Sequence, residues 1–161
     1  MALVQQQAVT PMPARLPPAI QETSWSCGPA AVVSCARALG VVVTEAQARS
    51  LSEADPAGTD SDQLLAALDA LGLRHQAEEF SDADAAREFL HGSLASSRPC
   101  ILAVDDWDHW VAATGFDEDD LIVVQDPGVG RMSTPSDKLM RRWRHSTAQV
   151  PFYAISVSRG G

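Results

Sequence analysis

The sequence predicts a single α+β domain, with helices in its first half and antiparallel strands in its second. Apolar residues at helical spacing dominate the first half, and short apolar runs separated by polar turns dominate the second. The length of 161 residues suits one domain that buries a hydrophobic core. We expect this domain to span residues 21–161, after an extended lead-in over residues 1–20 whose prolines disfavour regular structure.

The first strong element is a helix over residues 27–39. Pro29 suits its first turn, where the missing N–H has no intrahelical partner in any case. Gly40 provides the stop. The segment is apolar nearly all round, which predicts a helix buried in the centre of the domain.

Two shorter helices follow. The pattern over residues 44–47 is a capping box, and it opens a helix that ends near Leu51. A loop with Pro56 comes next, and leucines at helical spacing then predict a helix over residues 61–71 that Gly72 closes.

A strand over residues 73–80 and another helix complete the first half. The polar stretch 81–84 is typical of a helix start, and Ala85, Phe89 and Leu90 would form the buried face of that helix.

The second half contains three short apolar runs, which predict strands at residues 100–104, 109–116 and 121–125. A polar linker joins the last two runs, so we expect them to form a hairpin. A helix over residues 136–144 and a final strand over residues 152–157 would follow.

Charge and composition exclude several classes of partner. The net charge of −9 disfavours nucleic acid and anionic membrane surfaces, because both are bound through Lys and Arg. No apolar run reaches the roughly 18 residues of a membrane span, and no secretory signal is visible. Three cysteines, an odd number, argue against a disulfide framework and favour a reducing cytoplasm. Without Cys-x-x-Cys or His-x-x-x-His pairs, neither a metal nor a cofactor is expected. The oligomeric state is left open.

Cys27 is a candidate nucleophile because it lies at the start of the predicted buried helix. The N-terminal end of a helix carries a partial positive charge and free N–H groups, and both favour a thiolate. Gly28 would let the backbone turn sharply beside it. By position alone, Cys27 also fits a small buried hydrophobic residue, which is the better interpretation for Cys35 and Cys100.

His109 and Asp126 are candidates for the base and for the group that orients it. In an antiparallel hairpin, the start of the strand with His109 and the end of the strand with Asp126 lie side by side. The carboxylate could then hydrogen-bond to the imidazole and stabilise the imidazolium. Gln21, six residues before Cys27, could donate its amide to an oxyanion. Taken singly, these three residues also fit an acidic loop, an Asp-Pro-Gly turn and an exposed loop.

Together these residues resemble a known family, the double-glycine leader peptidases, which are bacteriocin-processing cysteine peptidases of the papain-like clan. The resemblance rests on residues 21–30 (QETSWSCGPA), 108–111 (DHWV) and 126–127 (DP), and it runs from about Gln21 to Gly130. It implies a papain-like fold. In that fold a helical half would carry Cys27 on a central helix, and an antiparallel sheet half would carry the histidine and the aspartate.

The resemblance also implies roles for individual residues. Cys27 would be the nucleophile, His109 the general base and acid, Asp126 the orienting residue and Gln21 the oxyanion donor. Neighbours of these residues are then expected to contact the substrate, namely Trp25, Gly28, Asp108 and Trp110.

The expected activity is a thiol-dependent peptidase that cleaves a peptide or amide bond through a thioester. Water makes such an enzyme a hydrolase, whereas an amine acceptor makes it an acyl transferase or transpeptidase, and the sequence leaves both open. A non-catalytic peptide-binding domain is the other alternative, but such domains usually lose the cysteine or the histidine. The expected partner is a peptide or protein substrate.

An acidic run, Asp105, Asp106 and Asp108, precedes His109. We expect these carboxylates to raise the pKa of His109 and to favour substrates that carry an amine or a basic side chain. A solvated loop is the plainer interpretation of the same run.

Overall fold

The computed structural model describes residues 19–146 and 151–160, so most of the expected lead-in over residues 1–20 lies outside the described residues. The elements run in chain order as α2 (Cys27–Ala38), α3 (Glu45–Ser52), α4 (Ser61–Ala70), β1 (Leu73–Phe80), α5 (Ala83–Ala95), β2 (Cys100–Val104), β3 (His109–Phe116), β4 (Ile122–Asp126), β5 (Gly130–Thr134), α6 (Ser136–Trp143) and β6 (Phe152–Arg159). The predicted α+β class is confirmed. Each expected helix and strand is present, and every boundary that was predicted lies within two residues of the observed one.

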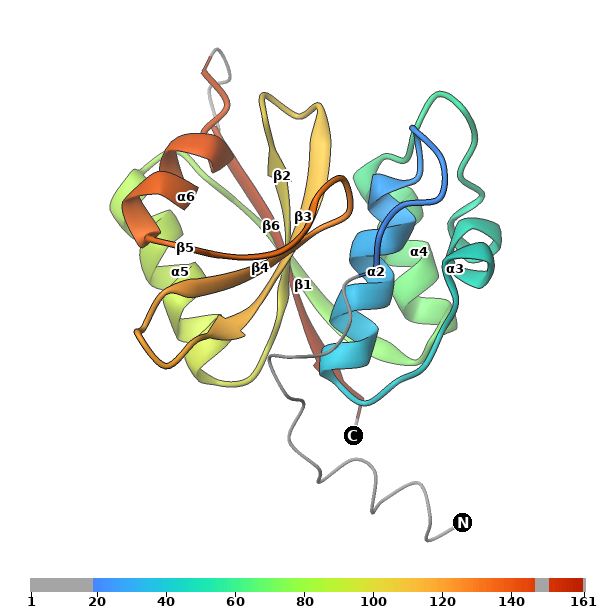
Figure 1. Ribbon diagram of the computed structural model, residues 1–161, viewed down its shortest axis with the longest axis horizontal. Coiled ribbons are helices and arrows are strands. Elements are labelled where there is room, and N and C mark those ends of the chain that lie inside the picture. The colour runs from blue at the N-terminus through green and yellow to red at the C-terminus, as the bar shows by residue number, and fades with distance from the viewer. Residues whose placement is uncertain (1–18, 147–150, 161) are drawn as a thin grey trace, which may run out of the picture.

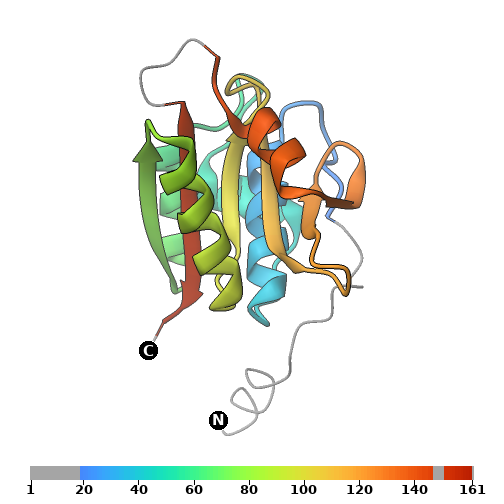
Figure 2. The same ribbon diagram turned by 90° about the vertical axis from the view of Figure 1, so that its left-hand side faces the viewer.

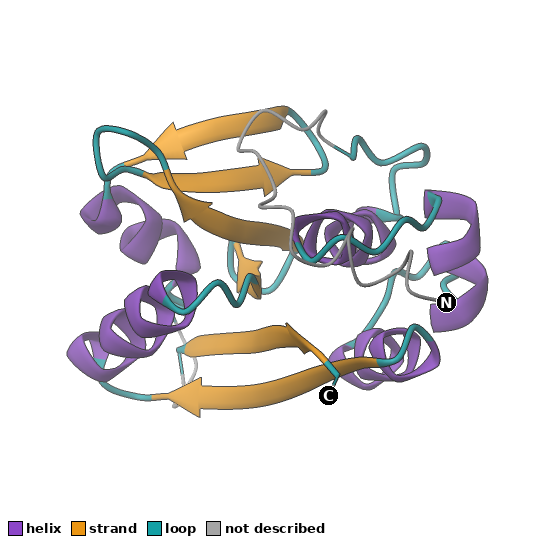
Figure 3. Ribbon diagram, turned by 90° about the horizontal axis from the view of Figure 1, so that it is seen from below, coloured by secondary structure: helices purple, strands orange, loops and turns teal. Residues whose placement is uncertain are grey.

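The strands of the described chain form one six-stranded antiparallel sheet in the order β1-β6-β2-β3-β4-β5. The first and last strands are neighbours, so the sheet joins the two ends of the domain. The expected hairpin is formed by β3 and β4, with an irregularity between Ala113 and Gly115. Figure 3 shows how far the sheet twists between β1 and β5.

The edge strand β5 was not predicted from the sequence. It pairs only with β4, and its middle residues Arg131, Met132 and Ser133 are exposed. A short strand at a sheet edge buries few side chains and therefore has little apolar periodicity to reveal it.

Helices cover both faces of the sheet (Figures 1 and 2). On one face α2, α3 and α4 enclose a core that includes Val32, Leu64 and Ile155. On the other face α5 and α6 enclose a core that includes Leu90 and Trp143. Strand β2 lies between these two cores and is buried along its whole length, which explains why it appears in the sequence as an uninterrupted apolar run.

Helix α2 is buried from Gly28 to Ala36 and packs against β3. This confirms the central buried helix. The buried face of α5 differs from the prediction by one position, because Ala86 rather than Ala85 joins Leu90 in the core. A helix turns 100° per residue, so a shift of one position moves a side chain from the core to the surface. Among the described residues, no helix has both the length and the apolar character that crossing a membrane requires.

The α5 core predicts the largest losses of stability. Leu90 is fully buried, so Leu90→Ala removes apolar contacts and leaves a cavity. We expect its free energy of unfolding to fall by about 2–5 kcal/mol in urea denaturation. Val42, 90% exposed, provides the control, and Val42→Ala should change stability by less than about 0.5 kcal/mol. Equal effects of the two substitutions would contradict this description of the core.

Candidate active site

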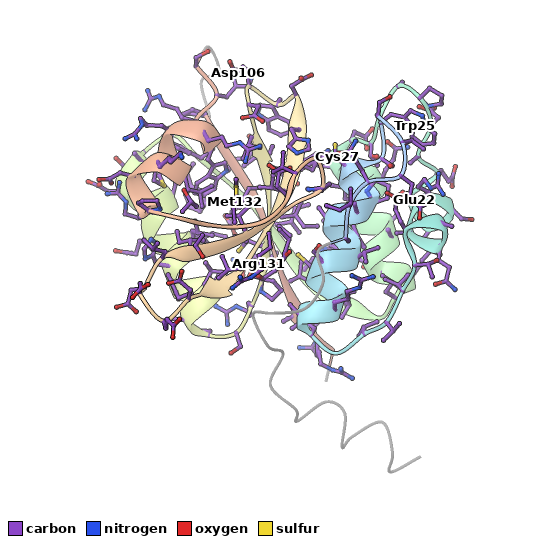
Figure 4. All side chains as sticks on the ribbon, viewed as in Figure 1. Glu22, Trp25, Cys27, Asp106, Arg131 and Met132 are labelled. Atoms are coloured by element: carbon purple, nitrogen blue, oxygen red, sulfur yellow. The ribbon has the colours of Figure 1, made fainter. Side chains whose placement is uncertain are left out.

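Cys27 is the first residue of α2 and is partly buried, at the end of the helix that faces the strands (Figure 4). Its own N–H lies in the first helical turn, where backbone donors have no intrahelical acceptor. The preceding residue, Ser26, occupies the N-cap position, but its side chain makes no capping hydrogen bond. The first turn of α2 also contains no acidic residue. The positive end of the helix dipole is therefore directed at the thiol without a carboxylate from that turn to offset it.

The loop before Cys27 is fixed by Glu45, a residue that stands out in the sequence only as part of a capping box. Oε1 of Glu45 accepts hydrogen bonds from the backbone N–H of Glu22 at 2.8 Å and from Oγ of Ser26 at 3.0 Å. The Glu45 carboxylate is buried and forms an ion pair with Arg49 at 3.4 Å. A buried charge needs such partners, and here the partners are the segment that leads into the cysteine.

His109 begins β3, Asp126 ends β4, and their side chains are joined by a hydrogen bond. Nε2 of the imidazole lies 2.7 Å from Oδ1 of the carboxylate. The Cys27 side chain lies close enough to the imidazole to contribute to the raised pKa of the histidine. Because Nε2 is engaged by Asp126, Nδ1 is the ring nitrogen left for the sulfur. The histidine therefore lies between the thiol and the carboxylate.

The surroundings of His109 favour its charged form. Burial alone lowers the pKa of a histidine, because it penalises the imidazolium. Here the hydrogen bond and charge of Asp126, together with those of Cys27, more than offset burial and raise the pKa of His109 to about 9. The histidine is therefore expected to be protonated at neutral pH, which suits an ion pair with a thiolate.

The side chain of Asp126 is only 4% exposed, and its carboxylate accepts hydrogen bonds from three donors. Oδ1 accepts from His109 and from the backbone N–H of Gly128 at 2.9 Å, and Oδ2 accepts from Nη2 of Arg142 at 2.8 Å. Burial raises the pKa of the carboxyl, but these donors and the nearby positive charges hold it well below its usual range. Arg142, 16 residues away along the chain, was not predicted as part of the site, and Gly128 was expected only as part of an Asp-Pro-Gly turn.

Gln21 lies beside the Asp126 turn. Its backbone N–H donates to the carbonyl of Pro127 at 2.9 Å, which ties the loop before α2 to the end of β4. Its side-chain Nε2 donates to the carbonyl of Thr23 at 2.7 Å. An amide nitrogen carries two hydrogens, so this bond uses one of them and a second donor remains.

The four expected substrate contacts have different surroundings. Trp110 is 7% exposed and donates its indole N–H to the carbonyl of Thr59, which places it in the core rather than on a surface that a substrate reaches. Trp25 lies on the side of the loop away from the strands (Figure 4). Asp108 is exposed. Gly28 is buried without a left-handed backbone, so the sharp turn expected there is absent.

Gly28 is needed for close packing. A Cβ at this position would lie 3.0 Å from Cδ2 of Leu64 and 3.0 Å from Oγ1 of Thr59. The absent side chain lets the first turn of α2 approach α4 and the loop before it.

The hydrogen bonds and charges that raise the pKa of His109 are those of Asp126 and Cys27, so the acidic run does not raise it directly as expected. Asp105 forms two hydrogen bonds with Arg142, and Asp106 accepts from the backbone and the hydroxyl of Ser146 at 2.8 and 3.0 Å. These carboxylates are therefore engaged by other partners.

The fold is that of the papain-like cysteine peptidases. Two similar solved structures are the peptidase domain of Streptococcus ComA, a bifunctional ABC transporter of a quorum-sensing pathway, and a double-glycine-motif protease from an AMS/PCAT transporter in complex with a leader peptide. The first has a TM-score of 0.69 and 20% sequence identity, covering 89% of this chain and 98% of that domain. The second has a TM-score of 0.68 and 20% identity, covering 93% and 96%.

The chain belongs to the Peptidase C39 family, whose family model matches residues 15–150. It is also 29% identical over 122 residues to an uncharacterized protein of Methanothermobacter thermautotrophicus, which covers 76% of this chain and 79% of that protein. The resemblance drawn from the sequence motifs is thereby confirmed, and the protein is a cysteine peptidase.

The close packing at Gly28 leads to a prediction with a matched control. Gly28→Ala forces its new methyl group against Leu64 and Thr59, and we expect a loss of about 1–3 kcal/mol in the free energy of unfolding and slower alkylation of Cys27. Gly92 lies exposed in α5 with nothing within 4 Å of a Cβ, so Gly92→Ala should stabilise the protein by about 0.5–1 kcal/mol. Thermal unfolding and thiol labelling measure both effects. Stabilisation by Gly28→Ala would contradict the packing argument.

Proposed function

We propose that this chain cleaves peptide bonds with Cys27 as nucleophile, His109 as general acid and base, Asp126 as the residue that orients His109, and Gln21 as an oxyanion donor. The observation that carries the proposal is the position of the His109 ring, which is hydrogen-bonded at 2.7 Å to the Asp126 carboxylate and whose pKa is raised by Asp126 and Cys27 together. Membership of a cysteine peptidase family supports this assignment.

The reaction begins when the Cys27 thiolate attacks the carbonyl carbon of the scissile bond. Two groups would donate hydrogen bonds to the negative oxygen that forms. They are the backbone N–H of Cys27 and the second N–H of the Gln21 amide. His109 then gives its proton to the leaving amine, the C–N bond breaks, and a thioester on Cys27 remains. Water, deprotonated by His109, attacks the thioester and releases the acid, and the thiolate returns.

Asp126 makes this proton exchange directional. Its bond to Nε2 holds the ring so that Nδ1 serves the sulfur and the leaving group. The bonds from Gly128 and Arg142 keep the carboxylate ionised and prevent its rotation. A histidine with a raised pKa is a ready acid for the amine, and it yields the proton because the collapsing intermediate makes that amine strongly basic.

A peptide is the substrate that we propose. Two exposed apolar residues, Ile20 and Val129, flank the hydrogen bond between Gln21 and Pro127, and they offer apolar surface beside the site. The AMS/PCAT protease, similar to this chain over 93% of its length, was solved with a leader peptide bound. We therefore propose peptides with a Gly-Gly pair before the cleaved bond as the first substrate class to test.

Alkylation of Cys27 with iodoacetamide tests the assembly of the site. Cys27 should react rapidly at pH 6–7, and His109→Ala should slow this reaction by about tenfold or more, because an unassisted thiol is only a few per cent ionised at pH 7. The difference in alkylation rate between the wild type and His109→Ala should disappear as the pH rises through about 9, where His109 loses its proton. Peptide mass spectrometry measures the rate at each cysteine.

The chain supplies controls for this experiment. Cys35 and Cys100 are fully buried, and burial raises the pKa of Cys100 to about 11, so both should stay unlabelled in the folded protein. His75 pairs with Asp69 at 2.8 Å without a cysteine, so His75→Ala should leave the Cys27 profile unchanged. Equal labelling of Cys27 in the wild type and in His109→Ala would contradict the proposed roles.

Cleavage of a Gly-Gly peptide tests the substrate class and the fate of the thioester. The wild type should release the carboxyl-terminal product, Cys27→Ala should release none, and replacing Gly-Gly by Val-Val should abolish cleavage in a mass-spectrometric assay. Added hydroxylamine reports the thioester on Cys27, because this amine competes with water for the acyl group and converts it to the hydroxamate. Equal cleavage of both peptides would reject the Gly-Gly preference, and no product from either would reject peptide hydrolysis of this class.

A further inference from the structure

Arg142 connects the Asp126 carboxylate to a second carboxylate, that of Asp105. Its Nη2 lies 2.8 Å from Oδ2 of Asp126 and 3.0 Å from Oδ2 of Asp105, and its Nε lies 2.9 Å from Oδ1 of Asp105. The backbone N–H of Asp105 also donates to the carbonyl of Arg142 at 3.0 Å. The side chains therefore form a row, Asp105, Arg142, Asp126 and His109, in which negative and positive charges alternate.

The turn that presents Asp105 is strained. Asp105, Asp106 and Trp107 all have left-handed backbones, with φ of 56°, 57° and 68°. Such a conformation is unfavourable for residues other than glycine, least so for Asp and most for a bulky residue such as Trp. It persists only where the surroundings fix it, and clusters of this kind are typical of functional sites.

Contacts on both sides hold this turn. Asp106 accepts two hydrogen bonds from Ser146, and the Trp107 ring packs on Tyr153 at 5.1 Å and against Trp110 at 5.8 Å. Held in this way, the turn directs the Asp105 carboxylate at α6. The side chain of Asp105 is 43% exposed, so its bond to Arg142 is not forced by burial. The strained backbone of this turn therefore places the Asp105 carboxylate against Arg142.

We propose that Asp105 is a positioning residue of the proposed peptidase, which acts through Arg142 to fix the Asp126 carboxylate toward His109 and to offset the positive charge of the arginine. The proposal rests on the roles given above to His109 and Asp126. An arginine bound to Asp126 alone would offset much of the negative charge of the carboxylate that His109 needs. With Asp105 bound to the same guanidinium, Asp126 keeps a net negative field at the imidazole.

Other charged groups face this row. Cys27 contacts His109 from α2, and its thiolate would add a negative charge. On the turn, Asp106 is bound to Ser146 and lies 4.0 Å from His145, and Asp108 is exposed one residue before His109. Asp108 is therefore the appropriate control, because it carries the same charge nearer to His109 along the chain while its carboxylate is not part of the row.

The test is the titration of His109, followed by NMR of the imidazole C–H protons, in a Cys27→Ala background that removes the thiolate. Asp105→Asn retains a residue that tolerates the left-handed backbone, so the turn should survive, and thermal unfolding checks that it does. We expect Asp105→Asn to lower the pKa of His109 by about half a unit or more, the size of a unit charge lost at an effective dielectric between those of protein and water. Asp108→Asn should lower it by clearly less.

Two results would overturn the proposal. If Asp105→Asn leaves the titration unchanged, the arginine needs no counter-charge. If Asp105→Asn and Asp108→Asn lower the pKa of His109 equally, the effect comes from the net charge of the turn and not from the position of Asp105. The proposed function fails separately, in the alkylation of Cys27, if His109→Ala has no effect on the protein with its thiol intact.

Discussion

The hydrogen bond between His109 and Asp126 is the interaction on which the arrangement of the site depends. Asp126 carries a negative charge into a nearly closed environment, and an ionised carboxylate is stable there only when charged and polar donors surround it. Those donors come from β3, from the turn after β4 and from α6. Removing one partner from such a buried cluster typically costs about 3–5 kcal/mol, so the need to satisfy one carboxylate draws three parts of the chain together.

Helix α2 provides the second fixed point. The helix is buried from Gly28 to Ala36, so close packing fixes its position in the core. Cys27, at the end of this helix, is held in place by the same packing. The loop before it is bound at two places, to Glu45 on α3 and to Pro127 beside Asp126. The second of these contacts crosses between the helical layer and the sheet. The position of the thiol relative to the imidazole is thus set by packing and by a backbone hydrogen bond together.

The elements were predictable because their signals are local. Capping boxes, leucines at helical spacing and uninterrupted apolar runs mark α3, α4 and β2 within a few residues of sequence. The short edge strand β5 lacks such a signal. Cys27, His109 and Asp126 were predicted as site residues from their motifs, and the structure brings their side chains together. Arg142 and Glu45 were not predicted, because each contacts a partner 16 or more residues away and nothing in its neighbourhood distinguishes it. The same limit explains the acidic run. Proximity in sequence linked Asp105 to His109, but the fold gives Asp105 the guanidinium of Arg142, 37 residues away on α6, as its partner.

The distribution of charge at the site follows from these contacts. A thiolate and an imidazolium attract each other best where water is scarce, but scarce water also makes any uncompensated charge expensive. Each charge in the row from His109 to Asp105 has an opposite charge as its neighbour, so the site can hold several ions with little net charge at any point. The row ends at the half-exposed Asp105, where solvent screens the last charge. A left-handed turn that includes a tryptophan is an unfavourable way to place a carboxylate, and its presence here indicates that the chain tolerates local strain in order to complete the row at the surface.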